Sequence, residues 1–265
     1  MLELIDIHKT FNRGTVNEKV ALDGVSLKLM DGDFCTVIGG NGAGKSTLLN
    51  AIAGVWPVDE GAVLIDGKDI SALPEHQRAP YLGRVFQDPK MGTVSDMGID
   101  ENLAIAARRG QRRGLSWGVT KAEREAYVGM LREFDLGLEE RMTTKVGLLS
   151  GGQRQAITLL MATIKKPQLL LLDEHTAALD PKTAAKVLEL SDKIITEHRL
   201  TALMVTHNMK DAITHGNRLI MMSDGKIILD IAGEEKRSLT VKDLLRKFEE
   251  VSGSQLENDR MLLSE

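Results

Sequence analysis

The sequence predicts an α/β domain with a block of helices inserted into it. Two apolar runs of strand length, Phe34–Ile38 and Gln168–Leu172, each precede a helical segment; glycines follow the first run and two carboxylates follow the second. Continuous apolar runs of this kind are typical of parallel strands that helices cover on both faces. From about Asp96 to Ser150 helical patterns dominate, which indicates the inserted block. A chain of 265 residues can form one large domain of this class or two small ones.

The composition is that of a soluble globular protein, with 42% hydrophobic and 27% charged residues. A net charge of −4 gives no reason to expect binding to nucleic acid or to an anionic membrane surface. The single cysteine, Cys35, excludes an internal disulfide and favours a reducing cytosol. We expect neither a signal peptide nor a membrane span, because no apolar stretch approaches eighteen residues.

The N-terminal region predicts two strands, Leu2–His8 and Val20–Leu29, which both alternate apolar and polar residues. Between them, Lys9–Gly14 is expected to form a loop that carries one aromatic residue, Phe11. Aromatic residues make up only 3% of the chain. The Phe11 ring could stack on a nucleotide base or anchor the loop as a half-buried side chain.

A glycine-rich stretch, Gly39–Ser46, follows the first apolar strand and opens a helical segment, Thr47–Ala53. Glycines allow successive backbone N–H groups to point inward, and the helix N-terminus adds its positive end. The stretch therefore predicts a phosphate-binding loop, although a glycine turn without a ligand is the alternative. The residues expected to hold phosphate are Gly39, Asn41, Gly42, Ala43, Gly44, Lys45, Ser46 and Thr47.

Two side chains of this loop have predicted roles. Lys45 would reach the β- and γ-phosphates, and the Ser46 hydroxyl would be a ligand of Mg²⁺. A helix end contributes only about 0.3–2 kcal/mol. Micromolar nucleotide binding needs about 8 kcal/mol, so amides, Lys45 and metal must act together.

The chain between this loop and the helical block predicts two further strands, Ala62–Ile65 and Gly83–Phe86, the second ending at Gln87. Within the block we expect helices at Ile99–Ile105 and Lys121–Phe134. The basic run that separates them, Arg108–Gly114, is most simply a solvated loop, with contact to nucleic acid or lipid as the alternative.

A second anion-binding feature is predicted at Leu149–Gln153. Ser150 is a good N-cap for the helical segment that follows, and Gly151 and Gly152 expose backbone N–H groups at its start. The chain thus has one phosphate loop but two predicted anion sites, which suggests that the second site serves phosphates held by another copy of the chain.

The leucine-rich run ends at two carboxylates, Asp173 and Glu174. Ligands of parallel sheets bind at the carboxyl ends of the strands, so Asp173 would hold Mg²⁺ through water and Glu174 would face the γ-phosphate. After a helix from Pro181 to about Glu197, the strand Thr201–Thr206 ends at His207, a predicted γ-phosphate contact. Most of the other histidines are expected to be ordinary surface or loop residues: His8, His76, His175, His198 and His215.

The C-terminal part predicts two strands, Arg218–Met222 and Lys226–Asp230, joined by a turn. Beyond Gly233 we expect one amphipathic helix, Val241–Val251, and a loosely held polar tail. The expected division is a domain at 1–230 and a short C-terminal extension at 231–265.

Five elements occur in a fixed order: the phosphate loop, a strand-end Gln87, Leu149–Gln153, the Asp173–Glu174 pair and His207. In this order they resemble the ATP-binding subunit of an ABC transporter, over about residues 1–230. The resemblance implies a P-loop NTPase with a RecA-like parallel-sheet core. It also implies an N-terminal antiparallel β subdomain and an α-helical subdomain inserted at about 90–150.

The resemblance also implies roles for individual residues. Phe11 matches the family's adenine-stacking aromatic, and Gln87 matches its sensor of metal and water. Glu174 looks like the residue that polarises the attacking water, with His207 holding the γ-phosphate. The residues that would close over ATP bound to the opposite protomer, or communicate across the dimer, are Ser150, Gly151, Gly152, Gln153 and Asp180.

The partners implied by the resemblance are a second copy in an ATP-sandwich homodimer, transmembrane permease subunits and a solute-binding protein. ATP and Mg²⁺ would be the cofactors, and the chain would lie peripherally on the cytoplasmic face of the membrane. His175 and Ala156 stand where the family commonly has proline and arginine. Two stretches, Asp173–Asp180 and Val205–Met209, are similar to those of a branch of bacterial importer ATPases, some of which accompany solute-binding proteins for amino acids.

Two alternatives stay open at the level of the sequence. A soluble ABC ATPase of DNA repair or translation usually has two cassettes or a long coiled-coil insertion, and neither occurs here. A P-loop kinase or GTPase would leave the Ser-Gly-Gly helix start without a role, and no Asn-Lys-x-Asp motif is present.

Overall fold

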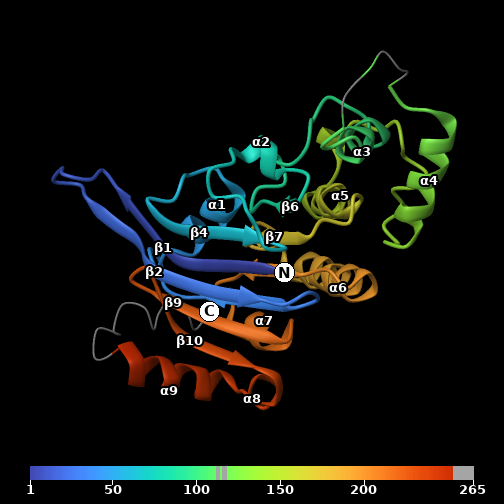
Figure 1. Cartoon of the computed structure of the whole chain (residues 1–265). Helices are drawn as coiled ribbons and strands as arrows, with labels where there is room; N and C mark the ends of the chain where they lie inside the picture. Colours follow the sequence, from blue (N-terminus) through green and yellow to red (C-terminus); the bar gives the residue numbers. More distant parts are fainter. Residues whose placement is uncertain (112–113, 115–117, 253–265) are drawn as a thin grey trace.

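The computed structural model describes residues 1–111, 114 and 118–252 and contains two sheets (Figure 1). The larger sheet has six strands in the order β10-β9-β3-β8-β7-β6. Adjacent strands of this sheet pair in parallel, except for the antiparallel pair of β9 and β10. Its strands are β3 (Phe34–Ile38), β6 (Leu82–Val85), β7 (Leu169–Asp173), β8 (Ala202–Val205), β9 (Arg218–Ser223) and β10 (Lys226–Ala232). The expected α/β fold is confirmed.

The three central strands are apolar because they are buried on both faces. All residues of β3 and β8 are buried, and so are the four leucines of β7. Leu172 lies beside Met204, and Val205 lies beside Val37, so β7, β8 and β3 end at the same edge of the sheet. The residues that follow these three strands are therefore brought together at this edge of the sheet.

The smaller sheet is antiparallel, in the order β2-β1-β4-β5. Its strands are β1 (Leu2–Phe11), β2 (Lys19–Leu29), β4 (Glu60–Ile65) and β5 (Lys68–Asp69). One core cluster joins its apolar face to helix α1 (Lys45–Ala53) and to the larger sheet. The predicted end of the first strand at His8 is wrong, because Thr10 and Phe11 pair with Val20 and Lys19. Phe11 thus ends a strand and does not lie in a loop.

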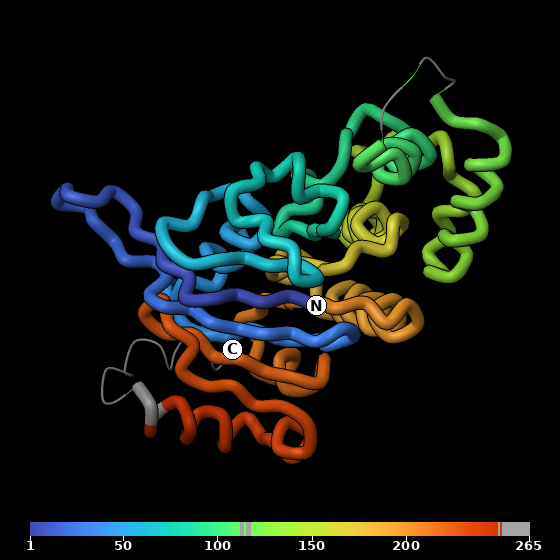
Figure 2. Tube along the Cα trace, in the orientation of Figure 1, coloured from blue at the N-terminus to red at the C-terminus, as the bar shows by residue number. Residues whose placement is uncertain are grey.

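The inserted helices form a lobe that projects from the sheets (Figures 1 and 2). Helices α3 (Ile99–Ala107) and α4 (Lys121–Arg132) share an apolar cluster with residues of α5 (Gly151–Thr163). Helix α6 (Pro181–His198) packs with α5 and the other face of the larger sheet. Shorter helices are α2 (Glu75–Arg78), the 3-10 turn η1 (Val146–Leu148) and α7 (Met209–Thr214).

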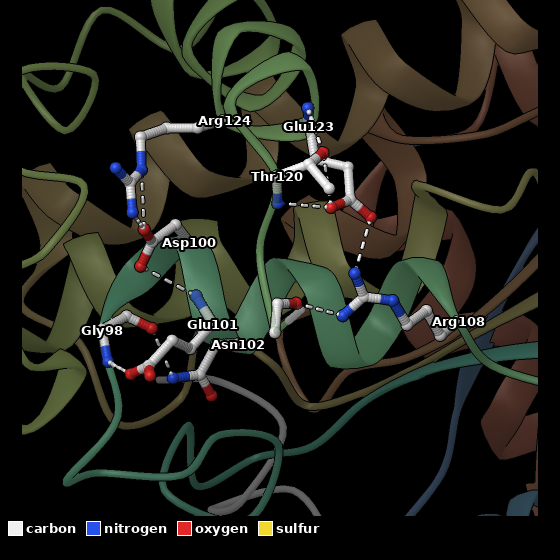
Figure 3. A network of polar contacts seen from close by, with 9 residues as sticks. Gly98, Asp100, Glu101, Asn102, Arg108, Thr120, Glu123 and Arg124 are labelled. Atoms are coloured by element: carbon white, nitrogen blue, oxygen red, sulfur yellow. Dashed lines mark hydrogen bonds and ion pairs between the residues drawn. The ribbon is translucent and has the colours of Figure 1, made fainter. Parts of the chain in front are cut away.

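A polar network fastens α4 to α3 (Figure 3). The Asp100 side chain is 3% exposed and accepts hydrogen bonds from Nε and Nη2 of Arg124 at 2.9 and 2.6 Å. Arg108 donates to Glu123 at 2.8 Å. The first ion pair joins the start of α3 to the start of α4, and the second joins the end of α3 to the start of α4, so the two helices are held together at both ends of α3.

This network corrects the expectation that the basic run Arg108–Gly114 is simply a solvated loop. Arg108 forms the ion pair just described, and the Arg109 guanidinium donates to the carbonyl of Ala162 at 3.1 Å. Burial lowers the pKa of Arg109. Arg112 and Arg113 lie outside the described residues.

The C-terminal segment contains two helices, α8 (Gly233–Arg237) and α9 (Val241–Ser252), where one was expected. Lys236 of α8 is 2% exposed and donates to the carbonyls of His215 and of Gly216, the latter at 3.0 Å. Burial lowers the pKa of Lys236 to about 8. Leu244 and Phe248 join a core cluster with β9. The predicted loose tail beyond residue 252 lies outside the described residues.

The helix that follows the glycine loop is capped at its other end by a buried arginine. Arg78 is 1% exposed, and its guanidinium donates to the carbonyls of Ala51 and Ile52 in α1 at 2.7 and 2.8 Å. It also donates to the carbonyls of Leu73 and Ser71, both at 2.7 Å. The side chain thus joins α1 to the segment after β5.

We expect Arg78→Met to lower the free energy of unfolding by about 3 kcal/mol, because a buried carbonyl without a partner costs about 1–3 kcal/mol. Urea unfolding followed by circular dichroism measures this change. The control is Arg237→Met, since the Arg237 side chain is 77% exposed. An equal effect of the two substitutions would contradict a capping role for Arg78.

Candidate functional site

The loop Gly39–Ser46 joins the carboxyl end of β3 to the start of α1. Its backbone requires glycine at two positions. Gly39 has φ +151°, and a Cβ there would lie 2.2 Å from the Met222 carbonyl oxygen. Gly44 has φ +101°, and a Cβ there would lie 2.5 Å from the Ala21 carbonyl oxygen. Gly44 precedes α1 without a side-chain cap, so the first N–H groups of this helix face the loop.

The Lys45 side chain lies within this loop. It is 7% exposed, and its Nζ donates to the carbonyls of Gly39 at 2.7 Å and Gly40 at 3.0 Å. The hydroxyl-bearing Ser46 next to it is exposed. A buried ammonium in the loop that precedes a helix N-terminus forms a positive site that suits a polyphosphate.

Asp173 ends β7 at the same edge of the sheet. Its Oδ2 lies 3.3 Å from Nη2 of Arg84, which also donates to Oδ1 of Asn50 at 2.8 Å. Burial raises the pKa of Asp173 although Arg84 and Lys45 act in the opposite direction. A further cation at this carboxylate would offset the cost of its burial.

Glu174 and His207 follow adjacent strands and are brought together. Glu174 Oε2 lies 3.7 Å from His207 Nδ1, and the backbone N–H of Glu174 donates to the Val205 carbonyl at 3.0 Å. The exposed fractions of the two side chains are 21% and 56%, so both can reach a ligand. Gln87 is exposed two residues after β6, the strand that pairs with β7.

The predicted second anion site lies at the start of α5. Ser150 is exposed and caps this helix, accepting the N–H of Gln153 at 3.3 Å. Gly152 packs so closely on α6 that a Cβ would lie 2.0 Å from Cγ2 of Thr183. Within the described residues, none of the hydrogen bonds of Ser150 and Gln153 reaches the phosphate loop. This helix start therefore presents its hydroxyl outward.

Asp180 caps α6, accepting the N–H of Thr183 at 3.1 Å, and this hydrogen bonding lowers the pKa of Asp180. It is exposed as well. A cavity of about 440 Å³ lies between the start of α5, residues 183–193 of α6 and residues 133–136 after α4, and Ser150 and Gln153 line it. The N-caps of both helices, Ser150 and Asp180, are exposed.

The Phe11 ring contacts Trp56, which the sequence analysis did not consider. Their centroids are 4.8 Å apart with the rings nearly perpendicular at 81°. Lys19 pairs with Phe11 across β1 and β2, and its Nζ would be 3.2 Å from a Cβ on Gly42. The strand end that carries Phe11 therefore lies close to the phosphate loop, and the ring is also anchored.

Most of the other histidines were expected at the surface or in loops, and one of them lies in a turn but is buried. His175 is 2% exposed, and its Nε2 lies 3.0 Å from Oγ of Ser191 in α6. Burial lowers the pKa of His175 to about 4. His215 is also engaged, with Nδ1 2.6 Å from Oδ2 of Asp192. The role of Arg84 was missed too, although a charge within an apolar strand is a signal of a buried partner.

A parallel sheet, a glycine loop after β3 and paired carboxylates after β7 define the chain as a P-loop nucleoside triphosphatase. Its solved neighbours agree with this class. The dimeric ATP-binding cassette MJ0796 bound to ADP and Pi has a TM-score of 0.75 at 30% identity, covering 88% of this chain and 98% of that one. The ADP conformation of MJ1267, a cassette of an ABC transporter, has a TM-score of 0.77 at 28% identity and covers 98% of both chains.

The chain belongs to the ABC transporter family, whose model matches residues 22–177. A tyrosine transport ATP-binding protein of Clostridioides difficile (strain R20291) is 42% identical over 94% of this chain and 99% of that protein. The methionine import ATP-binding protein MetN of Rhizobium johnstonii is 34% identical over 86% of this chain, which spans 60% of MetN. As a member of this family, the chain binds and hydrolyses ATP to drive transport.

Proposed function

We propose that two copies of the chain bind two ATP molecules head to tail and together power the import of an amino acid. The exposed cap of α5 carries the dimer proposal, because in the described part of the chain no hydrogen bond of Ser150 or Gln153 reaches the phosphate loop. A dimeric state in the MJ0796 cassette supports it. Ser150, Gly152 and Gln153 of one protomer would then complete the site of its partner, with Asp180 beside them.

The nucleotide would be held by the chain's own backbone and side chains as follows. Amides of Asn41 to Thr47 and the Lys45 ammonium bind the phosphates, and Phe11 stacks on the base once its ring leaves the edge of Trp56. The negative charge of the phosphates thereby interacts with positive groups that are already in place before ATP binds.

The residues present also fit Mg²⁺. Ser46 offers an exposed hydroxyl, and Asp173 offers a carboxylate whose burial calls for a cation. In the described part of the chain no group of three or more carboxylate, histidine or cysteine side chains is gathered as a metal site. This suits a metal that phosphate oxygens and water complete, as Mg²⁺ prefers, with Gln87 as a further contact. When bound, Mg²⁺ neutralises charge on the phosphates.

Hydrolysis then depends on position more than on covalent chemistry. Glu174 accepts a hydrogen bond from the attacking water and orients it in line with the γ-phosphate. His207, whose Nδ1 lies 3.7 Å from Glu174 Oε2, donates to the γ-phosphate. It thereby holds the γ-phosphate and the Glu174 carboxylate in their relative positions.

The relatives support the solute class. The tyrosine transport protein matches nearly the whole chain, and methionine import proteins match most of it. An aliphatic sulfonates import ATP-binding protein of Agrobacterium fabrum is 34% identical over 87% of this chain and 79% of that protein. We infer import of an amino acid, with tyrosine favoured by the higher identity. Transmembrane permease subunits and a solute-binding protein would complete the system, with this chain bound peripherally on the cytoplasmic face.

Within the described ranges, the structure has no helix of the length and apolar character that crossing a bilayer requires. The division into a domain at 1–230 and an extension at 231–265 is also part of the proposal, and Lys236 and Phe248 pack that extension onto the domain.

The test is to purify the tagged chain from its native membranes with its partners and to reconstitute the complex in vesicles. We expect a membrane protein and a solute-binding protein to co-purify, and ATP-dependent uptake of labelled tyrosine. Uptake should be absent without ATP. ATP turnover stimulated by DNA or ribosomes, with no membrane partner, would instead favour the soluble ABC ATPase of repair or translation.

A further inference from the structure

His175 directly follows Glu174, and its ring is directed into the protein against α6. The imidazole Nε2 lies 3.0 Å from Ser191 Oγ, and this hydroxyl donates its only hydrogen to the Val187 carbonyl at 2.8 Å. With the hydroxyl hydrogen assigned to the Val187 carbonyl, the hydrogen that joins the two side chains is carried by His175 Nε2. The bond connects the carboxyl end of β7 to the middle of α6, and both of its partners are 1–2% exposed.

Glu174 itself has an unusual backbone. Its φ of +43° lies in the left-handed region, which is unfavourable for a residue with a Cβ. Such a conformation persists only where the surroundings hold it. Two backbone hydrogen bonds contribute, from Glu174 N–H to the Val205 carbonyl at 3.0 Å and from Ala177 N–H to the Glu174 carbonyl at 2.9 Å.

These bonds fix the peptide units around Glu174. The buried side chain of His175 fixes the direction in which the chain continues. If the His175 ring were free to turn, residue 174 could relax toward a more usual φ. The Glu174 carboxylate would then leave the place where its Oε2 is 3.7 Å from His207 Nδ1.

We propose that His175 is a positioning residue for ATP hydrolysis: its hydrogen bond to Ser191 holds Glu174 in the left-handed conformation that aims the carboxylate at the attacking water. The inference rests on the proposed role of Glu174. It assigns a function to a buried imidazole whose side-chain hydrogen bond, among the described residues, goes to Ser191. A displacement of about 1 Å in such a group can lower turnover by up to about 100-fold.

The test compares Ser191→Ala, which removes the acceptor, with His175→Met, which removes the donor and keeps much of the volume. We expect each to lower kcat for ATP about tenfold, equivalent to about 1.4 kcal/mol of transition-state stabilisation. The Kd for a fluorescent ATP analogue should change less than about twofold, because the phosphate loop is untouched. His175→Gln, which can place an amide donor near the former Nε2, should recover most of the turnover.

A double-mutant cycle separates positioning from packing. The double variant His175→Met with Ser191→Ala should be no slower than either single variant, because both remove the same bond. In a Glu174→Gln background neither change should reduce the remaining turnover further. The matched control is Thr163→Ala in α5, which loses a similarly buried hydroxyl that donates to the Leu159 carbonyl at 2.8 Å, and its kcat should stay at the wild-type value.

Wild-type kcat in Ser191→Ala, with Glu174→Gln inactive, would overturn the inference and leave the proposed function intact. Wild-type kcat in Glu174→Gln would instead overturn the proposed function. If His175→Met does not fold, Ser191→Ala decides the question alone. If Thr163→Ala lowers kcat as much as Ser191→Ala does, the loss of a buried hydroxyl alone accounts for the effect, and the inference is also overturned.

Discussion

Lys45→Ala is expected to weaken ATP binding by about 100-fold, the upper end of what a charge-assisted hydrogen bond of about 1.5–3 kcal/mol can supply. The Lys45 ammonium is the buried positive charge inside the loop and binds the carbonyls of Gly39 and Gly40. Without it, these two carbonyls would face the phosphates and repel them. The backbone of the loop should survive, because the glycine conformations do not depend on the lysine.

Titration with a fluorescent ATP analogue measures this loss directly. Lys28→Ala is the control, since the Lys28 side chain is 53% exposed and pairs with Glu3 at 3.4 Å in the smaller sheet. Its Kd should equal that of the wild type. If Lys45→Ala binds the analogue with wild-type affinity, the phosphates do not sit in this loop.

Glu174→Gln is expected to slow ATP turnover by about 10²–10³-fold, the usual effect of removing one group that stabilises the transition state. Glutamine has the shape of the native side chain but cannot take a proton from the attacking water. The variant should therefore still bind ATP. We expect it to accumulate as a dimer, because the closed state with two nucleotides can no longer be hydrolysed.

Two measurements check this result: phosphate release for turnover, and size-exclusion chromatography at high protein concentration with and without ATP. Glu197→Gln, an exposed position on α6, should behave like the wild type. Adding Lys45→Ala should abolish the dimer of Glu174→Gln by removing the nucleotide. A monomer of Glu174→Gln in saturating ATP would count against the head-to-tail arrangement.

Much of the fold could be predicted from short stretches of sequence. The four leucines of β7 and the apolar run of β3 indicated buried parallel strands, because only strands covered on both faces are continuously apolar. The approach of Glu174 to His207 follows from the same rule, since residues at the carboxyl ends of adjacent parallel strands meet at one edge.

The errors have a common cause. The first strand was expected to end at His8, because Phe11 lies among residues typical of turns, yet pairing with Lys19 extends it. The burial of His175 was not foreseen either, because α6 supplies both the buried space and the hydroxyl of Ser191. In each case a partner distant in the chain outweighed the local preference.

The sequence by itself determined the succession of strands and helices along the chain. It also determined the phosphate loop and the candidate residues at the strand ends. Hydrophobic period, glycine and capping residues act over a few positions, so these features can be recognised locally. Only the tertiary structure decided that Arg84 contacts Asp173, 89 positions away, and that Arg78 caps α1 from 26 to 27 positions away. Such contacts depend on which side chains a packed core brings within hydrogen-bond distance, and no short stretch of sequence contains that information.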